Sequence, residues 1–432
     1  MTPTRPVPAP VPARIPAPTP APVVERPAHR DPNVLRWLGG YTSSAIGDNV
    51  YYLALSWAAV QAGTPAQAGF VTAASAVPRA LLMLGGGVVA DRYGPRRVVV
   101  SSTAVRCLLV LTAAVLLLAT SPGLWTLGCV AVLFGIVDAV FLPAAGALPA
   151  RITGRGQLAR VQGMRGLAVR LANVLGGPLG GLGIALGGTA GAFGLAALLI
   201  GVSLPVLATV RTGQPPPDDT RTRHDTKGRP SALAELRDGL RHIRRDPVLR
   251  VLVVFAALSD LGFVGPMNLG LTLLAAQRGW GSAGMGLVLA GFGVGAGAAS
   301  LLLAWRGRVP YAGRVTAVAT LAGAVAIDAL ARVPSVAAAA CVALLIGLLA
   351  GLAGALTGAL LQARAGSAYV GRVTSVSTLV GFGVAPLTFP AVGWAVAAWG
   401  AGPVFTVCAA VSALGGVLAL CSRALRHAEL PG

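Results

Sequence analysis

The chain has 432 residues, of which 55% are apolar and only 11% are charged. A soluble domain carries roughly 25% charged residues, so this chain has too little charge to cover the surface of a water-soluble fold. The net charge is +20, but the basic residues lie in short segments between apolar stretches and not on a polar face with interleaved aromatics. This pattern argues against nucleic acid as a partner.

Taken in chain order, residues 1–33 are rich in proline and have no apolar core. They are expected to form a disordered cytoplasmic tail, and they lack the apolar region that a cleaved signal peptide needs. Twelve apolar segments follow. Stretches of about 20 residues have the length that a helix needs to cross roughly 30 Å of hydrocarbon. The sequence therefore predicts an all-α membrane protein with twelve transmembrane helices.

A segment rich in charge and proline separates the sixth apolar stretch from the seventh. Its second part, LAELRDGLRHIRR, is compatible with a short surface helix. The predicted organisation is a Pro-rich tail (1–33), an N-terminal six-helix bundle (34–210), a basic cytoplasmic loop (211–247), a C-terminal six-helix bundle (248–422) and a cytoplasmic C-terminal tail (423–432).

Basic residues are concentrated in alternate loops, and the intervening loops hold only Arg278 and Arg332. Because Lys and Arg are retained on the cytoplasmic side of a membrane, the central loop and both termini are predicted to be cytoplasmic. The expected location is the inner (plasma) membrane, where the bilayer surrounds a multi-pass protein.

The two halves share residues at a constant separation of 212 positions, which indicates two copies of one six-helix unit. Parallel repeats with a site between them near the bilayer midplane are typical of transporters that work by alternating access. Duplication alone leaves a channel as an alternative. The matching pairs are Asp48 with Asp260, Arg160 with Arg372, Pro178 with Pro390, and Gly181 with Gly393.

Four charged residues lie deep inside apolar segments: Asp48, Arg79 and Asp138 in the first half, and Asp260 in the second. Each is about 11 to 13 residues from the cytoplasmic end of its segment, or roughly 16 to 20 Å at helical rise, which places it near the midplane. Charges at that depth are costly and usually functional. We hypothesise that Arg79 keeps one aspartate ionised, while an acid without such a partner carries a proton. The alternatives are structural pairing with Arg79 and, for Asp260, an inert carboxylate in a cavity.

The loop after the second segment reads Gly87-Val-Val-Ala-Asp91-Arg92-Tyr-Gly94-Pro-Arg96-Arg97. It resembles the signature of the major facilitator superfamily, which has the form G-x-x-x-D-R-x-G-x-R-R and lies in the same loop. The resemblance implies that Asp91 meets a helix N-terminus and basic groups of the other half, near Arg372, as a latch that breaks when the cytoplasmic side opens. Alternatively, the arginines of this loop are only topology determinants that face anionic lipid.

Three further patches are similar to the branch of that superfamily that includes macrolide-efflux proteins and the enterobactin exporter. This resemblance implies export of a drug-like, macrolide-like or siderophore-like small molecule. The loop motif, the repeat and the midplane charges favour protons as the counter-ion, and a monomer is expected. The patches are Ser44-Ala-Ile-Gly47-Asp48, Phe134-Gly-Ile-Val-Asp138-Ala-Val-Phe141-Leu-Pro143-Ala and Gly371-Arg372-Val-Thr-Ser375.

The fifth segment, Asn173-Val-Leu-Gly176-Gly177-Pro178-Leu-Gly180-Gly181, resembles the superfamily's antiporter motif G-x-x-x-G-P-x-x-G-G. It departs from that motif at Asn173 and Leu182, and close packing by small residues with a proline kink is the alternative. The fourth segment lacks the basic residue that many proton-driven exporters of the superfamily carry, so that route of coupling is not indicated.

Two charged features are expected to have ordinary roles. Arg106, nearer the cytoplasmic end of its segment, is expected to snorkel towards the interface or to support the latch. Asp328 and Arg332, one helical turn apart near the outer surface, are expected to form an ion pair.

Other classes of function fit the sequence less well. The four histidines lie outside the apolar segments with no metal-ligand spacing, which argues against a membrane-embedded transferase and against a metal or cofactor. Lys227 follows Thr226 and not the glycine of a phosphate-binding loop, which argues against an ATP-driven pump. An importer or facilitator of a small metabolite on the same fold remains the main alternative.

Overall fold

The computed structural model of the chain describes residues 27–120, 123–212, 232–306, 309–426 and 428. Most of the predicted N-terminal tail therefore lies outside the described residues. Every regular element in the described part is helical. The α-helices are α1 (Pro32–Ala62), α2 (Pro65–Tyr93), α3 (Pro95–Ala119), α4 (Leu124–Ala147), α5 (Pro149–Ile152), α6 (Leu158–Ala208), α7 (Ala232–Arg245), α8 (Pro247–Gly265), α9 (Leu271–Gln277), α10 (Gly281–Arg306), α11 (Ala312–Arg332), α12 (Val336–Trp399), α13 (Ala401–Cys421) and α14 (Arg423–Arg426). Two 3₁₀ turns, η1 (Ala28–Arg30) and η2 (Arg155–Gln157), and one π-helix, η3 (Pro266–Gly270), complete the set.

The described helices supply the predicted number of membrane spans. Nine segments are long and apolar enough to cross a bilayer, and α2, which is bent by 62°, makes ten. The apolar segment in α6 counts as two spans, because the helix breaks at Gly187 and Gly188. The remaining span is α1, a helix of 31 residues that carries polar residues at its middle. The spans of α12 meet at Gly366, whose φ of 69° favours glycine. The prediction of an all-α membrane protein with two sets of six helices is confirmed.

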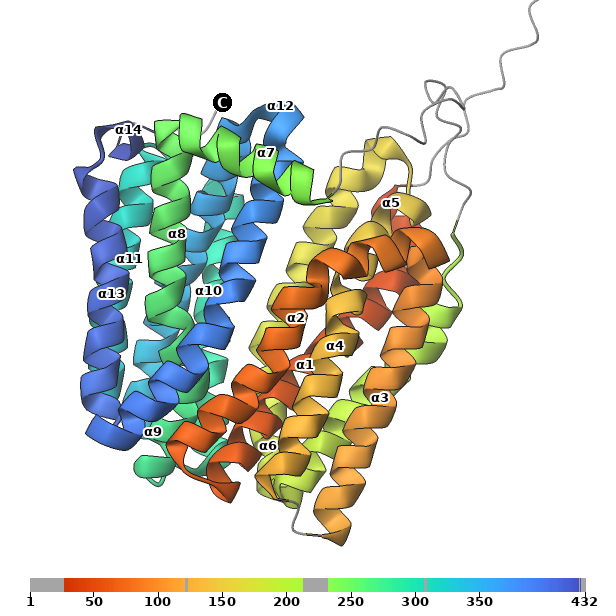
Figure 1. Ribbon diagram of the computed structural model, residues 1–432, viewed down its shortest axis with the longest axis vertical. Coiled ribbons are helices and arrows are strands. Elements are labelled where there is room, and N and C mark those ends of the chain that lie inside the picture. The colour runs from red at the N-terminus through yellow and green to blue at the C-terminus, as the bar shows by residue number, and fades with distance from the viewer. Residues whose placement is uncertain (1–26, 121–122, 213–231, 307–308, 427, 429–432) are drawn as a thin grey trace, which may run out of the picture.

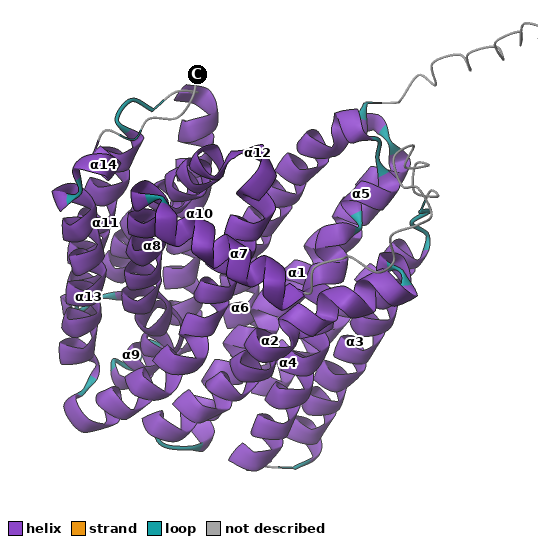
Figure 2. Ribbon diagram, turned by 45° about the horizontal axis from the view of Figure 1, so that its top comes forward, coloured by secondary structure: helices purple, strands orange, loops and turns teal. Residues whose placement is uncertain are grey.

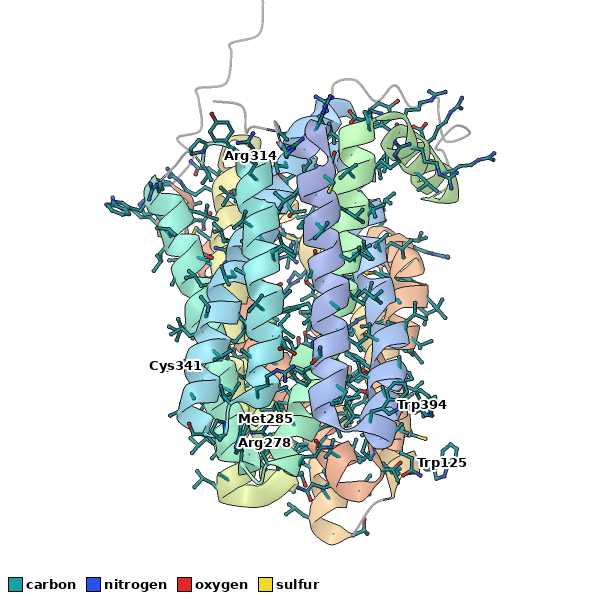
Figure 3. The ribbon with its side chains drawn as sticks, turned by 90° about the vertical axis from the view of Figure 1, so that its left-hand side faces the viewer. Trp125, Arg278, Met285, Arg314, Cys341 and Trp394 are labelled. Atoms are coloured by element: carbon teal, nitrogen blue, oxygen red, sulfur yellow. The ribbon has the colours of Figure 1, made fainter. Side chains whose placement is uncertain are left out.

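The two sets of helices, α1–α6 and α8–α13, lie side by side as two halves (Figure 1). We call the end of the molecule with α5, α7 and α14 the basic end, and the opposite end, with α9, the far end. Figure 3 shows Trp125 and Trp394 projecting outward near the far end, where aromatic side chains suit a membrane interface, and Arg314 at the opposite end.

Buried apolar residues show where the halves are joined. One large cluster combines residues of both halves, including Trp57 and Phe134 from the first and Met267 and Phe405 from the second. Towards the basic end the apolar residues form two separate clusters, one within each half. The ribbons of the two halves also diverge towards the basic end (Figure 2). The protein is therefore closed at the far end and separated at the basic end.

Small residues permit this closure. A Cβ atom added at Gly69 of α2 would lie 2.6 Å from the carbonyl oxygen of Phe389 in α12, and one at Gly181 of α6 would lie 2.9 Å from Cα of Gly286 in α10. The hydroxyl of Ser56 also bonds that of Thr272 across the halves at 2.9 Å. These contacts join the far portions of the helices.

We expect Gly69→Ala to destabilise the conformation that is closed at the far end. The new methyl group meets backbone atoms that cannot turn away, and overpacking of this kind costs about 1–3 kcal/mol. That cost corresponds to roughly a 5- to 150-fold change in the conformational equilibrium. Distances between spin labels on the basic ends of the two halves, measured by double electron–electron resonance, should shorten. Gly85→Ala on the same helix is the control, because a Cβ there meets no atom within 4 Å. Unchanged distances in Gly69→Ala would contradict this role.

Helix α7 lies across the basic end of the second half. Its Ile243 is buried, and the ring of His242 stacks on that of Tyr369 with centroids 4.1 Å apart. Asp238 accepts a hydrogen bond from Arg372 at 2.6 Å. The following residue, Asp246, caps α8 and pairs with Arg364 at 3.0 Å. The surface helix indicated by the sequence is thus present and is bound to α12 on both sides of its break.

Candidate functional site

The first half contains a buried network of charges centred on Arg106 of α3. Nη1 of Arg106 donates to both carboxylate oxygens of Asp48, at 2.8 and 2.9 Å, and lies 3.4 Å from Oδ1 of Asp138. Its Nη2 donates to Ser44 at 2.9 Å, and its guanidinium group lies 3.5 Å from the ring centroid of Phe141. The side chain of Arg106 has no exposed surface.

This placement corrects the expectation that Arg106 snorkels to the interface. Helix α3 begins at Pro95, so Arg106 lies well inside the helix, and its side chain reaches the two aspartates within the bundle. A buried carboxylate needs a cationic partner, and here two of them converge on one guanidinium group. The fully buried position of Arg106 is the consequence.

Arg79 of α2 forms the other side of the network. Its Nη1 donates to the hydroxyl oxygen of Tyr52 at 2.9 Å and lies 3.6 Å from Oδ2 of Asp138. The Tyr52 hydroxyl in turn donates to the same Asp138 oxygen at 3.2 Å. The guanidinium group also faces Phe382 of α12, 5.1 Å from the ring centroid, so Arg79 connects the network to the second half.

The network is balanced in formal charge. Two carboxylates, Asp48 and Asp138, lie with two guanidinium groups, Arg79 and Arg106. The sequence singled out three of these four residues, and the structure brings those three together. The sequence assigned Arg106 to the interface or the latch, and it gave no role in the network to Tyr52 or Ser44. Two acids with one arginine leave an unpaired charge, and this imbalance is the signal that could have pointed to a second cation.

Asp260 lies apart from this network, in α8 of the second half. It lines a cavity of about 400 Å³ with apolar, hydroxyl and amide side chains. Within the part of the chain that the structure describes, its carboxylate has no hydrogen bond or ion pair. Gly381 of α12 adjoins it, since a Cβ there would lie 3.6 Å from Oδ2 of Asp260, in ordinary van der Waals contact. Polar side chains of the cavity include Ser259, Thr320, Thr357, Gln362, Thr378 and Ser412.

The repeat explains why the two halves differ. Positions 212 residues after Arg106 and Asp138 hold Val318 and Ala350, so the second half lacks both the arginine that pairs with the acid and the second carboxylate of the network. Ala350 lines the cavity beside Asp260. The second half thus has a cavity with a lone carboxylate where the first half has a filled, charge-balanced network.

The predicted latch residues lie at the basic end of α2 and the start of α3. Gly94 forms the turn between these helices with φ of 86°, and Arg96 donates to the carbonyl oxygen of Ala208. Asp91 is exposed and has no ion pair or hydrogen bond among the described residues. Arg372 pairs with Asp238 of α7 and not with Asp91. This is the arrangement expected of a latch that is open at this end. The other motif residues at this end are Gly87, Arg92 and Arg97. The function of the motif as a latch remains a prediction.

The motif of the fifth apolar segment, residues 173–181, which we call the helix-5 motif, lies in α6 and packs against two neighbouring helices. A Cβ at Gly180 would lie 2.5 Å from a methyl carbon of Leu53 in α1, whereas Gly181 faces Gly286 in α10. Gly177 likewise faces α10, and Pro178 lies inside the helix. Close packing, the alternative interpretation of this motif, is therefore present. Asn173 has a different contact, because its Oδ1 accepts a hydrogen bond from Nδ2 of Asn49 at 3.3 Å.

The exposed pair at the far end is confirmed. Arg332 and Asp328 are joined by two hydrogen bonds of 2.9 and 3.0 Å, and Thr406 donates to the same carboxylate at 2.6 Å.

Two six-helix halves packed side by side, with cavities inside and between them, form the architecture of a multi-pass membrane transporter. The sequence profile described as Major Facilitator Superfamily matches residues 37–390. The chain belongs to the Major Facilitator Superfamily, and it is a transporter and not an enzyme. No match was found among curated proteins.

Solved structures of transporters share the fold. A mutant of the nucleoside transporter NupG is similar with a TM-score of 0.69 at 11% identity, covering 90% of this chain and 99% of that one. A D-xylose-proton symporter has a TM-score of 0.69 at 13% identity, covering 90% and 95%. A bacterial homolog of the human lysosomal transporter Spinster, inward-facing and occupied, has a TM-score of 0.67 at 14% identity, with the same two coverages.

Proposed function

We propose that this transporter exports an amphipathic compound in exchange for protons, and that Asp260 carries the proton. The supporting observation is that Asp260 has no partner among the described residues although it lines a cavity inside the helix bundle. Asp48 and Asp138, in contrast, are held by guanidinium groups. Neutralising either of those would leave a buried arginine partly uncompensated, whereas Asp260 can change its charge without breaking an ion pair.

A single segment of α12 touches both the proton carrier and the network. Gly381 adjoins the carboxylate of Asp260, and the next residue, Phe382, lies under the guanidinium group of Arg79. A change of charge at Asp260 therefore acts on the helix that joins the halves. This contiguity supports coupling between proton binding and the movement of one half against the other.

The substrate is proposed to be drug-like, macrolide-like or siderophore-like. The cavity around Asp260 is lined mainly by apolar groups such as Phe255, Phe263 and Ile327, with scattered hydroxyl groups. Such a lining suits a compound with a large apolar surface and few polar groups. The basic end, proposed to be cytoplasmic, is the open end, so the conformation is the one that admits a substrate from the cell interior. Asp91 and Arg372 are proposed to meet when this end closes.

The test uses purified protein in liposomes with an imposed pH gradient. Proton flux is recorded with and without macrolide-like and siderophore-like compounds, and compound movement is followed in right-side-out and inverted vesicles. The proposal expects compound-stimulated proton flux and accumulation in inverted vesicles. Accumulation in right-side-out vesicles alone would identify an importer. Compound movement at a rate independent of the pH gradient would identify a facilitator.

A further inference from the structure

Asparagines gather at one place in this protein. The chain contains four, and three of them, Asn49, Asn173 and Asn268, line a single cavity of about 240 Å³ between the halves. They come from α1 and α6 in the first half and from η3 in the second. Among the described residues, no acidic or basic side chain lines this cavity. The cavity therefore presents amide groups from both moving bodies and no formal charge.

The amides retain unused hydrogen-bonding capacity. Nδ2 of Asn49 donates to the carbonyl oxygen of Ala45 at 2.9 Å and to Asn173, and Nδ2 of Asn268 donates to the carbonyl oxygen of Val264 at 2.8 Å. Within the described residues, Nδ2 of Asn173 and the Oδ1 atoms of Asn49 and Asn268 have no partner. Donors and acceptors are thus both available, on groups that can each serve a hydroxyl, carbonyl or amide.

The local sequence builds this arrangement. Asn173 occupies the first position of the helix-5 motif, where the motif has glycine. Gly176, one turn further on, packs against the side chain of Asn49 and leaves space for it. Asn268 lies in the π-helix η3, a geometry that often marks functional sites because it interrupts regular helical hydrogen bonding. The departure from the motif thus supplies an amide and not only a change in packing.

We propose that this cavity, the amide subsite, binds an uncharged hydroxyl-bearing or carbonyl-bearing part of the transported compound, such as a glycosyl group. A charged group would lose hydration there without gaining a counter-ion, whereas a neutral polar group exchanges water for amide hydrogen bonds. Phe263 lines both the amide subsite and the cavity of Asp260, so one amphipathic molecule can extend from one to the other. Transport of that molecule rests on the proposed function, but its binding does not.

Equilibrium binding to the purified full-length protein tests the subsite without any ion gradient. The probes are 4-methylumbelliferyl β-glucoside, a neutral sugar on an apolar ring, and tetraphenylphosphonium, an apolar cation without hydrogen-bonding groups. Asn173→Gly and Asn268→Ala should each weaken glucoside binding about twofold to tenfold, the effect of one lost hydrogen bond, and leave the cation unaffected. Asn33→Ala is the matched control, since that amide bonds the backbone of Arg211 at the basic end.

Absence of saturable glucoside binding to the wild-type protein would overturn the proposal. Glucoside binding that survives in both variants would do the same. If Asn173→Gly does not yield a monodisperse protein, Asn268→Ala on the other half decides the question. The two proposals can fail separately. If the glucoside binds in an asparagine-dependent way but no compound stimulates proton flux, the proposed proton coupling is rejected. If proton flux is stimulated but glucoside binding does not depend on the asparagines, the amide subsite is rejected.

Discussion

Asp260→Asn is expected to abolish compound-stimulated proton flux in liposomes, to the level of protein-free vesicles, while the protein still binds its substrate. An amide of the same shape cannot take up a proton, and among the described residues no other carboxylate lines the cavity. Exchange of labelled compound across the membrane at equal concentrations should continue, because it requires movement of the halves but no net proton transfer.

Asp328→Asn is a suitable control for this result. That acid is also in the second half, but it lies at the far end in an ion pair with Arg332. Its replacement should leave proton flux unchanged. Wild-type flux in Asp260→Asn, together with loss of flux in Asp138→Asn, would move the proton carrier into the charge network and refute the assignment to Asp260.

Arg106→Leu is expected to produce the largest loss of stability of any single replacement in the site. Within the described residues, this guanidinium group is the one cation paired with Asp48 and one of the two near Asp138. Leaving a buried charge without its partner costs about 3–5 kcal/mol, because the charge remains desolvated. Reversible unfolding in mixed detergent and lipid micelles measures this loss as a lower free energy of unfolding.

Two further variants separate lost pairing from a general packing defect. Arg332→Leu breaks an ion pair whose arginine is 65% exposed, and little stability should be lost, because water and ions already screen that pair. In the double variant Asp48→Asn with Arg106→Leu, part of the stability should return, since Asp138 retains Arg79. A double variant no more stable than Arg106→Leu alone would show that the cost comes from the cavity left by the side chain.

Much of the fold could be predicted because the bilayer imposes it. The length of the apolar segments and the 212-residue repeat indicated the two sets of six helices, and counting residues along them placed Asp48, Arg79 and Asp138 at one depth. The depth of a residue along a helix does not show how that helix is rotated about its own axis. The contact of Tyr52 with Asp138, and the separation of Asp260 from the network, depend on how the helices are rotated and packed.

Side-chain length limited the prediction for Arg106. The position of its Cα indicated the interface, but an arginine spans several ångströms and its direction is decided by what it can pair with. The pairing of Arg372 with Asp238 could not be predicted from the sequence either, because hydropathy does not show where a surface helix docks on the helix bundle. The partners of Arg106 and of Arg372 are therefore determined by tertiary packing, which the sequence pattern does not show.

Helix α7 has a consequence for how the protein can be divided. It contacts α12 through Tyr369 and Arg372, after the break at Gly366, and Asp246, which links α7 to α8, pairs with Arg364 before that break. It therefore belongs mechanically to the second half, although it precedes that half's first membrane span. A gene cut ahead of Ala232 would leave each product with the polar contacts that fix its own helices. Two such fragments, produced together, should reassemble through the far-end contacts into a working protein. A cut after α7 would instead leave the second-half fragment without α7 and its contacts with α12.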